Sequence, residues 1–243
     1  MNRLARQILD TLSPRADPKQ GPLPPLLVAM TLVSGLVDAF SFLLLGHVFV
    51  ANMTGNVIFL GFALAGERGF SITASLLALT AFWIGATING RVNRSVTHRG
   101  RRLVRGLLAE VVLATLGLIL FSLSHHPLGA GAADSLVVLL AAAMGVQNAT
   151  AAALGVRGLT TTVVTRTITE AASHSVLAGG AGATSGRSVV AVATLFIGAL
   201  CGVALILHVR QFTALTAALV ILVAVMIAAH LTGRATPAWT SEP

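Results

Sequence analysis

The sequence is poor in charge and in cysteine. Only 10% of its 243 residues are charged, whereas soluble domains carry about 25%. The single cysteine, Cys201, excludes an internal disulfide and a cysteine-based metal cluster, and the apolar run around it predicts a packed, inert thiol. The sequence also lacks metalloprotease, serine-hydrolase, P-loop and dinucleotide-binding motifs. These absences disfavour an enzyme, and we expect no cofactor and no metal site.

Apolar runs dominate what is present. Hydrophobic residues make up 55% of the chain, and its mean hydropathy is +0.87. Because about 20 consecutive apolar residues cross a bilayer, the expected fold class is an all-α integral membrane protein. Six runs predict transmembrane helices: Pro25–Leu45, Ser71–Gly90, Val104–Leu123, Ser135–Leu154, Ser188–His208 and Phe212–Leu231. Residues 1–22 then form a cytoplasmic N-terminal segment, 23–232 a single transmembrane domain and 233–243 a C-terminal tail.

The formal net charge of +8 would suit nucleic-acid binding, but the placement of the basic residues argues against it. Ten of the sixteen Lys and Arg residues lie in two clusters without stacking aromatics: Arg3, Arg6, Arg15 and Lys19, and Arg91, Arg94, Arg99, Arg101, Arg102 and Arg105. Basic clusters beside membrane spans are typical of orientation signals and lipid-headgroup contacts. We therefore expect the lipid bilayer and no nucleic acid as a partner, with both termini in the cytoplasm.

Two further apolar segments are interrupted by polar residues. Residues 47–66, "HVFVANMTGNVIFLGFALAG", contain Asn52, Thr54, Gly55 and Asn56, and residues 159–180 are rich in threonine. If residues 47–66 crossed the bilayer, the arginine-rich loop at 91–105 would lie on the side opposite the basic N-terminus, against the positive-inside rule. The charge pattern favours six full spans with two interrupted or re-entrant segments.

The two interrupted segments occupy matching places in two halves, residues 23–123 and 134–232. Gly35 and Asp38 in "SGLVDAF" pair with Gly145 and Asn148 in "MGVQNAT" at an offset of 110. With three full spans per half, the second half starts from the opposite side of the membrane, which predicts an inverted two-fold repeat. Paired interrupted segments at corresponding positions indicate the binding site of a transporter.

The blocks "GLVDAFSFLLLGHVFVANMTGN" and "GVQNATAAALGVRGLTTTVVTRTITEAA" resemble the YoaK-type family of bacterial inner-membrane proteins (domain of unknown function 1275). That family shows Gly-x-x-Asp-Ala followed by Met-Thr-Gly-Asn, and Gly-x-Gln-Asn-Ala followed by a threonine-rich stretch. The resemblance covers nearly the whole chain and implies a polytopic inner-membrane protein, without an established activity. The matching positions are Asp38, Thr54, Gly55, Asn56, Gln147, Asn148, Thr162 and Thr165. Arg166 departs from the pattern, which usually has glycine at this place.

Polar residues within the apolar segments are the candidate site. A charged residue at the bilayer centre costs at least about 2.5 kcal/mol and usually faces a cavity or a partner. Asp38 is therefore either a proton or cation site, or a structural group that bonds a neighbouring helix or caps the interrupted segment. The Met-Thr-Gly-Asn element is either a helix break that contacts a ligand or a polar helix–helix junction. The candidate substrate- or ion-binding residues are Asp38, Asn52, Thr54, Gly55, Asn56, Gln147, Asn148, Thr162, Thr165, Arg166 and Glu170.

Three other patterns bear on the interior. Arg166, Glu170 and His174 share one helical face, so that Arg166 either pairs with Glu170 or faces a cavity and attracts an anion. We expect Glu110 to snorkel toward Arg102 or Arg105; the alternative is a part in transport chemistry. The glycines of "GALCG", at 198 and 202, are typical of close helix packing within a bundle or across a homodimer.

The function predicted from these patterns is a small secondary transporter or permease for an unknown small solute or ion. Its polar site would lie near mid-membrane, between the two interrupted segments. The alternatives are a non-transporting membrane scaffold or regulatory partner protein, in which the glycines and threonines serve only packing, and an ion or proton channel.

Overall fold

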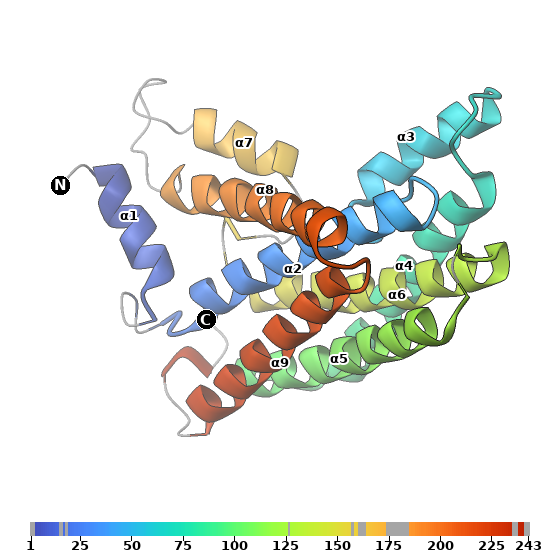
Figure 1. The fold of residues 1–243 in the computed structure, drawn as a ribbon. Coiled ribbons are helices and arrows are strands. Elements are labelled where there is room, and N and C mark those ends of the chain that lie inside the picture. The colour runs from blue at the N-terminus through green and yellow to red at the C-terminus, as the bar shows by residue number, and fades with distance from the viewer. Residues whose placement is uncertain are drawn as a thin grey trace.

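The computed structural model describes residues 3–14, 17, 19–125, 127–156, 158–159, 164–173, 185–234 and 238–240. Its elements are helices (Figure 1). The long ones are α2 (Leu23–Leu44), α4 (Ile72–Asn93), α5 (Arg99–Leu123), α6 (Ala130–Leu154), α8 (Ser185–His208) and α9 (Thr213–Gly233). The short ones are α1 (Arg3–Leu12), α3 (Met53–Leu64), α7 (Val164–Ser173) and the 3-10 turn η2 (Ala238–Thr240).

Among the described residues, six helices are long and apolar enough to cross a membrane, and they lie at the six predicted positions. Their 21 to 25 residues correspond to about 31–37 Å, which covers the roughly 30 Å hydrocarbon core. α5 begins before the predicted Val104 because His98 caps it: the Nδ1 atom of His98 accepts the N–H of Arg101 at 3.2 Å. This extends the helix through the arginine cluster.

The helices pack in pairs that join the two halves of the chain. α2 lies along α8 and α4 along α6, while α5 contacts α6 and α9, and α9 contacts α2. Glycines allow the closest approaches: a Cβ at Gly35 would collide with the main chain of α8, and one at Gly145 with that of α4. Gly198 and Gly202 both face α2, as predicted for packing within the bundle. Cys201 is exposed on α8, so the prediction of a packed thiol is wrong; α8 turns its glycines, rather than its cysteine, toward α2.

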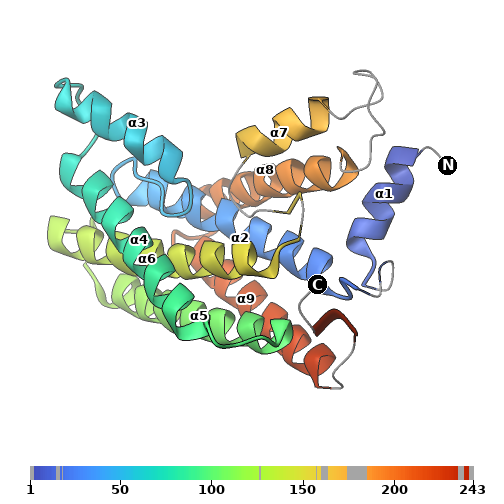
Figure 2. The same ribbon diagram turned by 180° about the vertical axis from the view of Figure 1, so that it is seen from behind.

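Both termini and the arginine-rich α4–α5 connection gather at one end of the bundle, here called the terminal end. The Arg99 guanidinium donates to the main-chain oxygens of Lys19 and Leu154, and Trp239 lies against Gly21 near the start of α2. Figures 1 and 2 place α1 and the C-terminus at this end, and α3 at the opposite, far end. An even number of crossings separates the two termini, in agreement with six spans.

Candidate functional site

The segment between α2 and α3 turns back into the bundle. The Oδ1 atom of Asp38, on α2, accepts hydrogen bonds from the N–H groups of Val50 (3.0 Å) and Ala51 (2.7 Å). Asp38 lies about 9 Å along the helix before the end of α2 at Leu44, so α3 begins at that depth. α3 has 12 residues, or about 18 Å, and is too short to cross a hydrocarbon core of about 30 Å. The segment enters and leaves at the far end, as the re-entrant interpretation predicts.

The Met-Thr-Gly-Asn element holds this turn. Asn56 is fully buried; its Oδ1 accepts the N–H of Phe49 (2.9 Å), and its Nδ2 donates to the carbonyl of Phe49 (2.6 Å). Gly55 lies under the ring of Phe49, where a Cβ would come within 2.6 Å of the Cδ2 atom of that ring. Thr54 is exposed, and Asn52 precedes α3 without a side-chain capping bond. The element is therefore a helix break whose buried polar group binds the protein's own main chain.

Aromatic rings pack the re-entrant segment against α2. Phe42, near the end of α2, stacks on Phe49 with ring centroids 5.0 Å apart. Phe59 of α3 stacks on Phe49 (5.5 Å) and on Phe70 (4.8 Å). The Nδ1 atom of His47, whose φ is +57°, donates to a carbonyl of the α3–α4 connection at 3.1 Å. One face of α3 is thus fixed by rings, and its other face is left exposed.

The two polar residues predicted on α6 differ in their contacts. Gln147 is buried, and its Nε2 donates to Ser34 Oγ (2.7 Å) and to the carbonyl of Met30 (3.3 Å), both on α2. Its Oε1 is buried without a hydrogen-bond partner among the described residues. Asn148 Nδ2 donates within its own helix, to the carbonyl of Met144 at 2.9 Å. Gln147 thus ties α6 to α2 in the core.

The second interrupted segment is only partly described. Thr165 is exposed on α7. Arg166 and Glu170 belong to this helix, but their side chains lie outside the described residues, as do Thr162 and His174. The pairing of Arg166 with Glu170 stays a prediction. Figures 1 and 2 show α7 toward the terminal end and α3 toward the far end, so the two interrupted helices lie toward opposite ends of the bundle.

A buried carboxyl group absent from the predicted site lies on α5. Glu110 has no exposed surface, and neither Oε1 nor Oε2 has a hydrogen-bond partner among the described residues. The prediction that Glu110 snorkels to Arg102 or Arg105 is wrong. Arg105 lies about 140° round the helix axis from it, and Arg102 donates instead to the main-chain oxygens of Val96 and Ala153.

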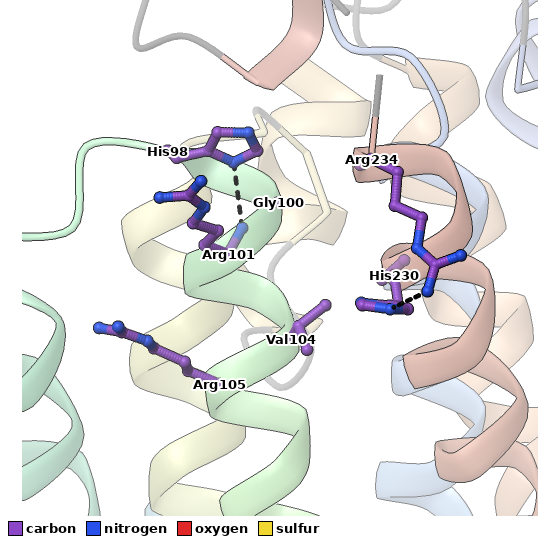
Figure 3. A pocket seen from close by; sticks show the side chains of 9 residues that line it. His98, Gly100, Arg101, Val104, Arg105, His230 and Arg234 are labelled. Atoms are coloured by element: carbon purple, nitrogen blue, oxygen red, sulfur yellow. Dashed lines mark hydrogen bonds between the residues drawn. The ribbon is translucent and has the colours of Figure 1, made fainter. Parts of the chain in front are cut away.

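Two pockets open at the ends of the seam between α5 and α9. The terminal pocket, of about 410 Å³, is lined by residues that include His98, Arg101, Arg105, His230 and Arg234 (Figure 3). The far pocket, of about 530 Å³, is lined by Phe121, Ser122, Arg210, Gln211 and Phe212. Glu110 lies between them on α5, about 8 Å along the helix from Arg105 and about 17 Å from Phe121. Along α5, a buried acid thus lies at a level between two pockets whose linings include basic residues.

Comparison with known proteins assigns the chain to a family. The family profile described as "Protein of unknown function (DUF1275)" matches residues 26–228. The chain belongs to this family. A curated relative, the UPF0700 transmembrane protein YoaK of Bacillus subtilis (strain 168), is 32% identical over 148 residues, which cover 59% of this chain and 63% of the relative. The match spans less than two thirds of the length of YoaK, and no solved structure matches the chain.

As a DUF1275 protein with a transmembrane relative and six apolar helices, the chain is a multi-pass membrane protein. Residues of the DUF1275 pattern build contacts inside the bundle: Asp38 and Asn56 fix the re-entrant turn, and Gln147 joins α6 to α2. Glu110 lies outside both pattern blocks but within the matched region. The described pattern residues of this DUF1275 chain therefore account for how the helices and the re-entrant turn are held together, rather than for a chemical activity.

Proposed function

We propose that this DUF1275 protein is a small secondary transporter, or permease, in which Glu110 binds a coupling proton. The observation that carries the proposal is the fully buried Glu110 carboxyl, whose oxygens have no partner among the described residues. An ionised carboxylate at membrane depth costs at least about 2.5 kcal/mol, so a carboxyl without a partner holds a proton instead. Asp38, the other candidate proton site, uses its Oδ1 for main-chain bonds.

Among the described residues, the Glu110 oxygens have no partner that would hold the carboxyl ionised. α5 contacts α4, α6, α9 and η2, whose described buried residues include no titratable side chain. It also contacts α2 through Phe40 and Phe121, and the titratable residue buried on α2 is Asp38, itself an acid. On α5, Arg99 is buried about 17 Å away along the helix, and it donates to main-chain oxygens. Proton release from Glu110 therefore requires water to reach it.

The pockets at the two ends of the α5–α9 seam are the routes we propose for that water. Opening the seam from one end and then from the other would expose Glu110 to one side of the membrane at a time, which is alternating access. The packing supports the inverted repeat that this mechanism uses. If α2 is exchanged with α6, α4 with α8 and α5 with α9, the contact α2–α8 becomes α6–α4 and the reverse, and α5–α9 is retained. The exchange therefore gives the same set of helix contacts.

We propose that the terminal end faces the cytoplasm of a bacterial cell and that the chain lies in its inner membrane. The arginine-rich α4–α5 connection and the basic N-terminal segment share the terminal end, and an excess of Lys and Arg marks the cytoplasmic side. In this orientation Arg210, which lines the far pocket, is a basic residue on the side opposite the cytoplasm and does not follow the rule.

A non-transporting scaffold is the second candidate. It is favoured by α3, whose outward face exposes Val57, Ile58, Phe62 and Leu64, and by the turn before α3, where the buried polar groups bind the main chain. In that role α3 would pack against a partner membrane protein or a second copy of the chain. A scaffold has no need to open the seam around Glu110.

Carbodiimide labelling distinguishes the two candidates. N,N′-dicyclohexylcarbodiimide is apolar and reacts with protonated carboxyl groups, and peptide mass spectrometry of the protein in liposomes locates the adduct. We expect labelling at Glu110 in the folded transporter, loss of that adduct in Glu110→Gln, and no change in Glu67→Gln, which alters an exposed loop. A protein labelled at Glu110 only after unfolding in SDS would support the scaffold.

Proton movement provides the functional measurement. Liposomes with entrapped pyranine report internal pH while a panel of ions, sugars and organic anions is added outside. We expect at least one solute to drive proton entry in the wild type and in Glu67→Gln, but not in Glu110→Gln. If Glu110→Gln moves protons as the wild type does, Glu110 is not the coupling group.

A further inference from the structure

The terminal pocket is rich in basic residues. Among the residues that the structure describes, its lining includes Arg101, Arg105 and Arg234 and no aspartate or glutamate. Gly100 and Gly233, where α5 begins and α9 ends, lie side by side, and the ring of Trp239 packs against both. Both glycines also line the pocket, whose open volume is about 410 Å³.

The arrangement of the basic side chains leaves their charge available. In Figure 3 the His230 ring points from α9 toward α5, and Arg234 donates from Nη2 to His230 Nε2 at 3.1 Å. This bond orients the Arg234 guanidinium without neutralising it. Arg101 and Arg105 extend from successive turns along the flank of α5 that is turned away from α9 (Figure 3). The first turn of α5 adds the positive end of a helix dipole.

The helix surfaces next to this pocket are lipid-facing. Leu108 of α5, on the same flank as Arg101 and Arg105, is 53% exposed, and Leu231 of α9 is 58% exposed. Leu108 lies about one turn from Arg105 toward the apolar body of the bundle, and Leu231 lies at the level of the pocket residues of α9. A ligand held by the guanidinium groups therefore has apolar surface beside it, which suits acyl chains.

We infer that the terminal pocket binds the phosphate of an anionic phospholipid headgroup. Guanidinium groups bind phosphate oxygens with paired, charge-assisted hydrogen bonds, and basic pockets between transmembrane helices at the cytoplasmic side bind anionic headgroups. The pocket favours a lipid over a free anion because its open side adjoins the exposed apolar flank of α5. The lipid closes the terminal end of the α5–α9 seam. This inference does not depend on transport.

Lipid binding to the purified protein tests it by native mass spectrometry in detergent. Phosphatidylglycerol is compared with phosphatidylcholine, since both carry a phosphate but only the first has net negative charge. We expect preferential binding of phosphatidylglycerol by the wild type. Each arginine contributes on the order of fivefold in affinity, so R101Q/R105Q/R234Q should weaken it by about a hundredfold. The matched control R68Q, in the α3–α4 connection at the far end, should bind as the wild type does.

Competition with free phosphate shows whether the pocket binds the phosphate of a lipid headgroup or a soluble phosphate. If inorganic phosphate at millimolar concentration does not displace phosphatidylglycerol, the lipid is the ligand. If it displaces the lipid completely, the ligand is a soluble phosphate and the lipid assignment falls. Equal lipid binding by wild type and triple variant, with unchanged thermal unfolding, overturns the site altogether. A triple variant that unfolds early is replaced by the single variants, whose losses should each be about fivefold.

Discussion

Replacing Asn56 tests the structural role of the Met-Thr-Gly-Asn element. Asn56→Leu retains a side chain of similar size but removes both hydrogen bonds to the main chain of Phe49. A buried polar group left unpaired costs about 1–3 kcal/mol, and here the N–H and the carbonyl of Phe49 both lose their partner. Because Phe49 is only partly buried, we expect the lower half of the summed range, a loss of about 2–4 kcal/mol in the free energy of unfolding.

The measurement is an SDS titration of the protein in mild-detergent micelles, followed by tryptophan fluorescence. Asn56→Asp, which keeps the acceptor and loses the donor, should fall between wild type and Asn56→Leu. Thr54→Ala is the matched control, because Thr54 is exposed on the same turn, and it should change stability by less than about 0.5 kcal/mol. If Asn56→Leu unfolds as the wild type does, Asn56 does not hold the re-entrant turn.

Variants at three further sites test separate contacts. Gly145→Val forces a side chain into the main chain of α4 and should cost about 1–3 kcal/mol or more, whereas Gly61→Val, with open space around its Cβ, should unfold as the wild type does; equal unfolding of the two variants contradicts the close approach of α4 and α6. Asp38→Asn keeps an acceptor oxygen for two N–H groups and should retain stability, while Asp38→Ala should lose about 2–4 kcal/mol; equal losses would mean that the charge, not the acceptor, matters. Arg99→Gln removes a donor to the carbonyl of Lys19 and should speed trypsin cleavage after Lys19; an unchanged rate counts against that contact.

The spans were predictable because each is long and apolar, and burial in lipid demands little else of a helix. The boundaries of the spans were less predictable, because the N-terminal extension of α5 depends on His98 as a cap. The charge pattern predicted that residues 47–66 re-enter, and the bond from Asp38 to Ala51 is the local reason. The sequence offered a cap of the interrupted segment as one of two roles for Asp38, but which N–H groups it binds was not predictable, because that main-chain path is set only by tertiary packing.

The prediction for Glu110 shows where a closer reading of the sequence would have helped. Glu110 lies one and two turns from Leu107 and Leu103 on the same face of α5, and this face is buried. Helical periodicity alone thus places the carboxyl on the core side, away from Arg105. The contacts of Asn56 carried no such signal, since its partner is the backbone of Phe49.

The pairing of α2 with α8 and of α4 with α6 has a consequence for biosynthesis. Neither half can complete its packing alone, because the glycine faces at Gly35 and Gly85 meet helices of the other half. Because the ribosome adds about 5–20 residues per second, α2 is in the bilayer for on the order of ten seconds or more before α8 has been synthesised. During that interval the nascent chain exposes its glycine faces to lipid and to other nascent membrane proteins.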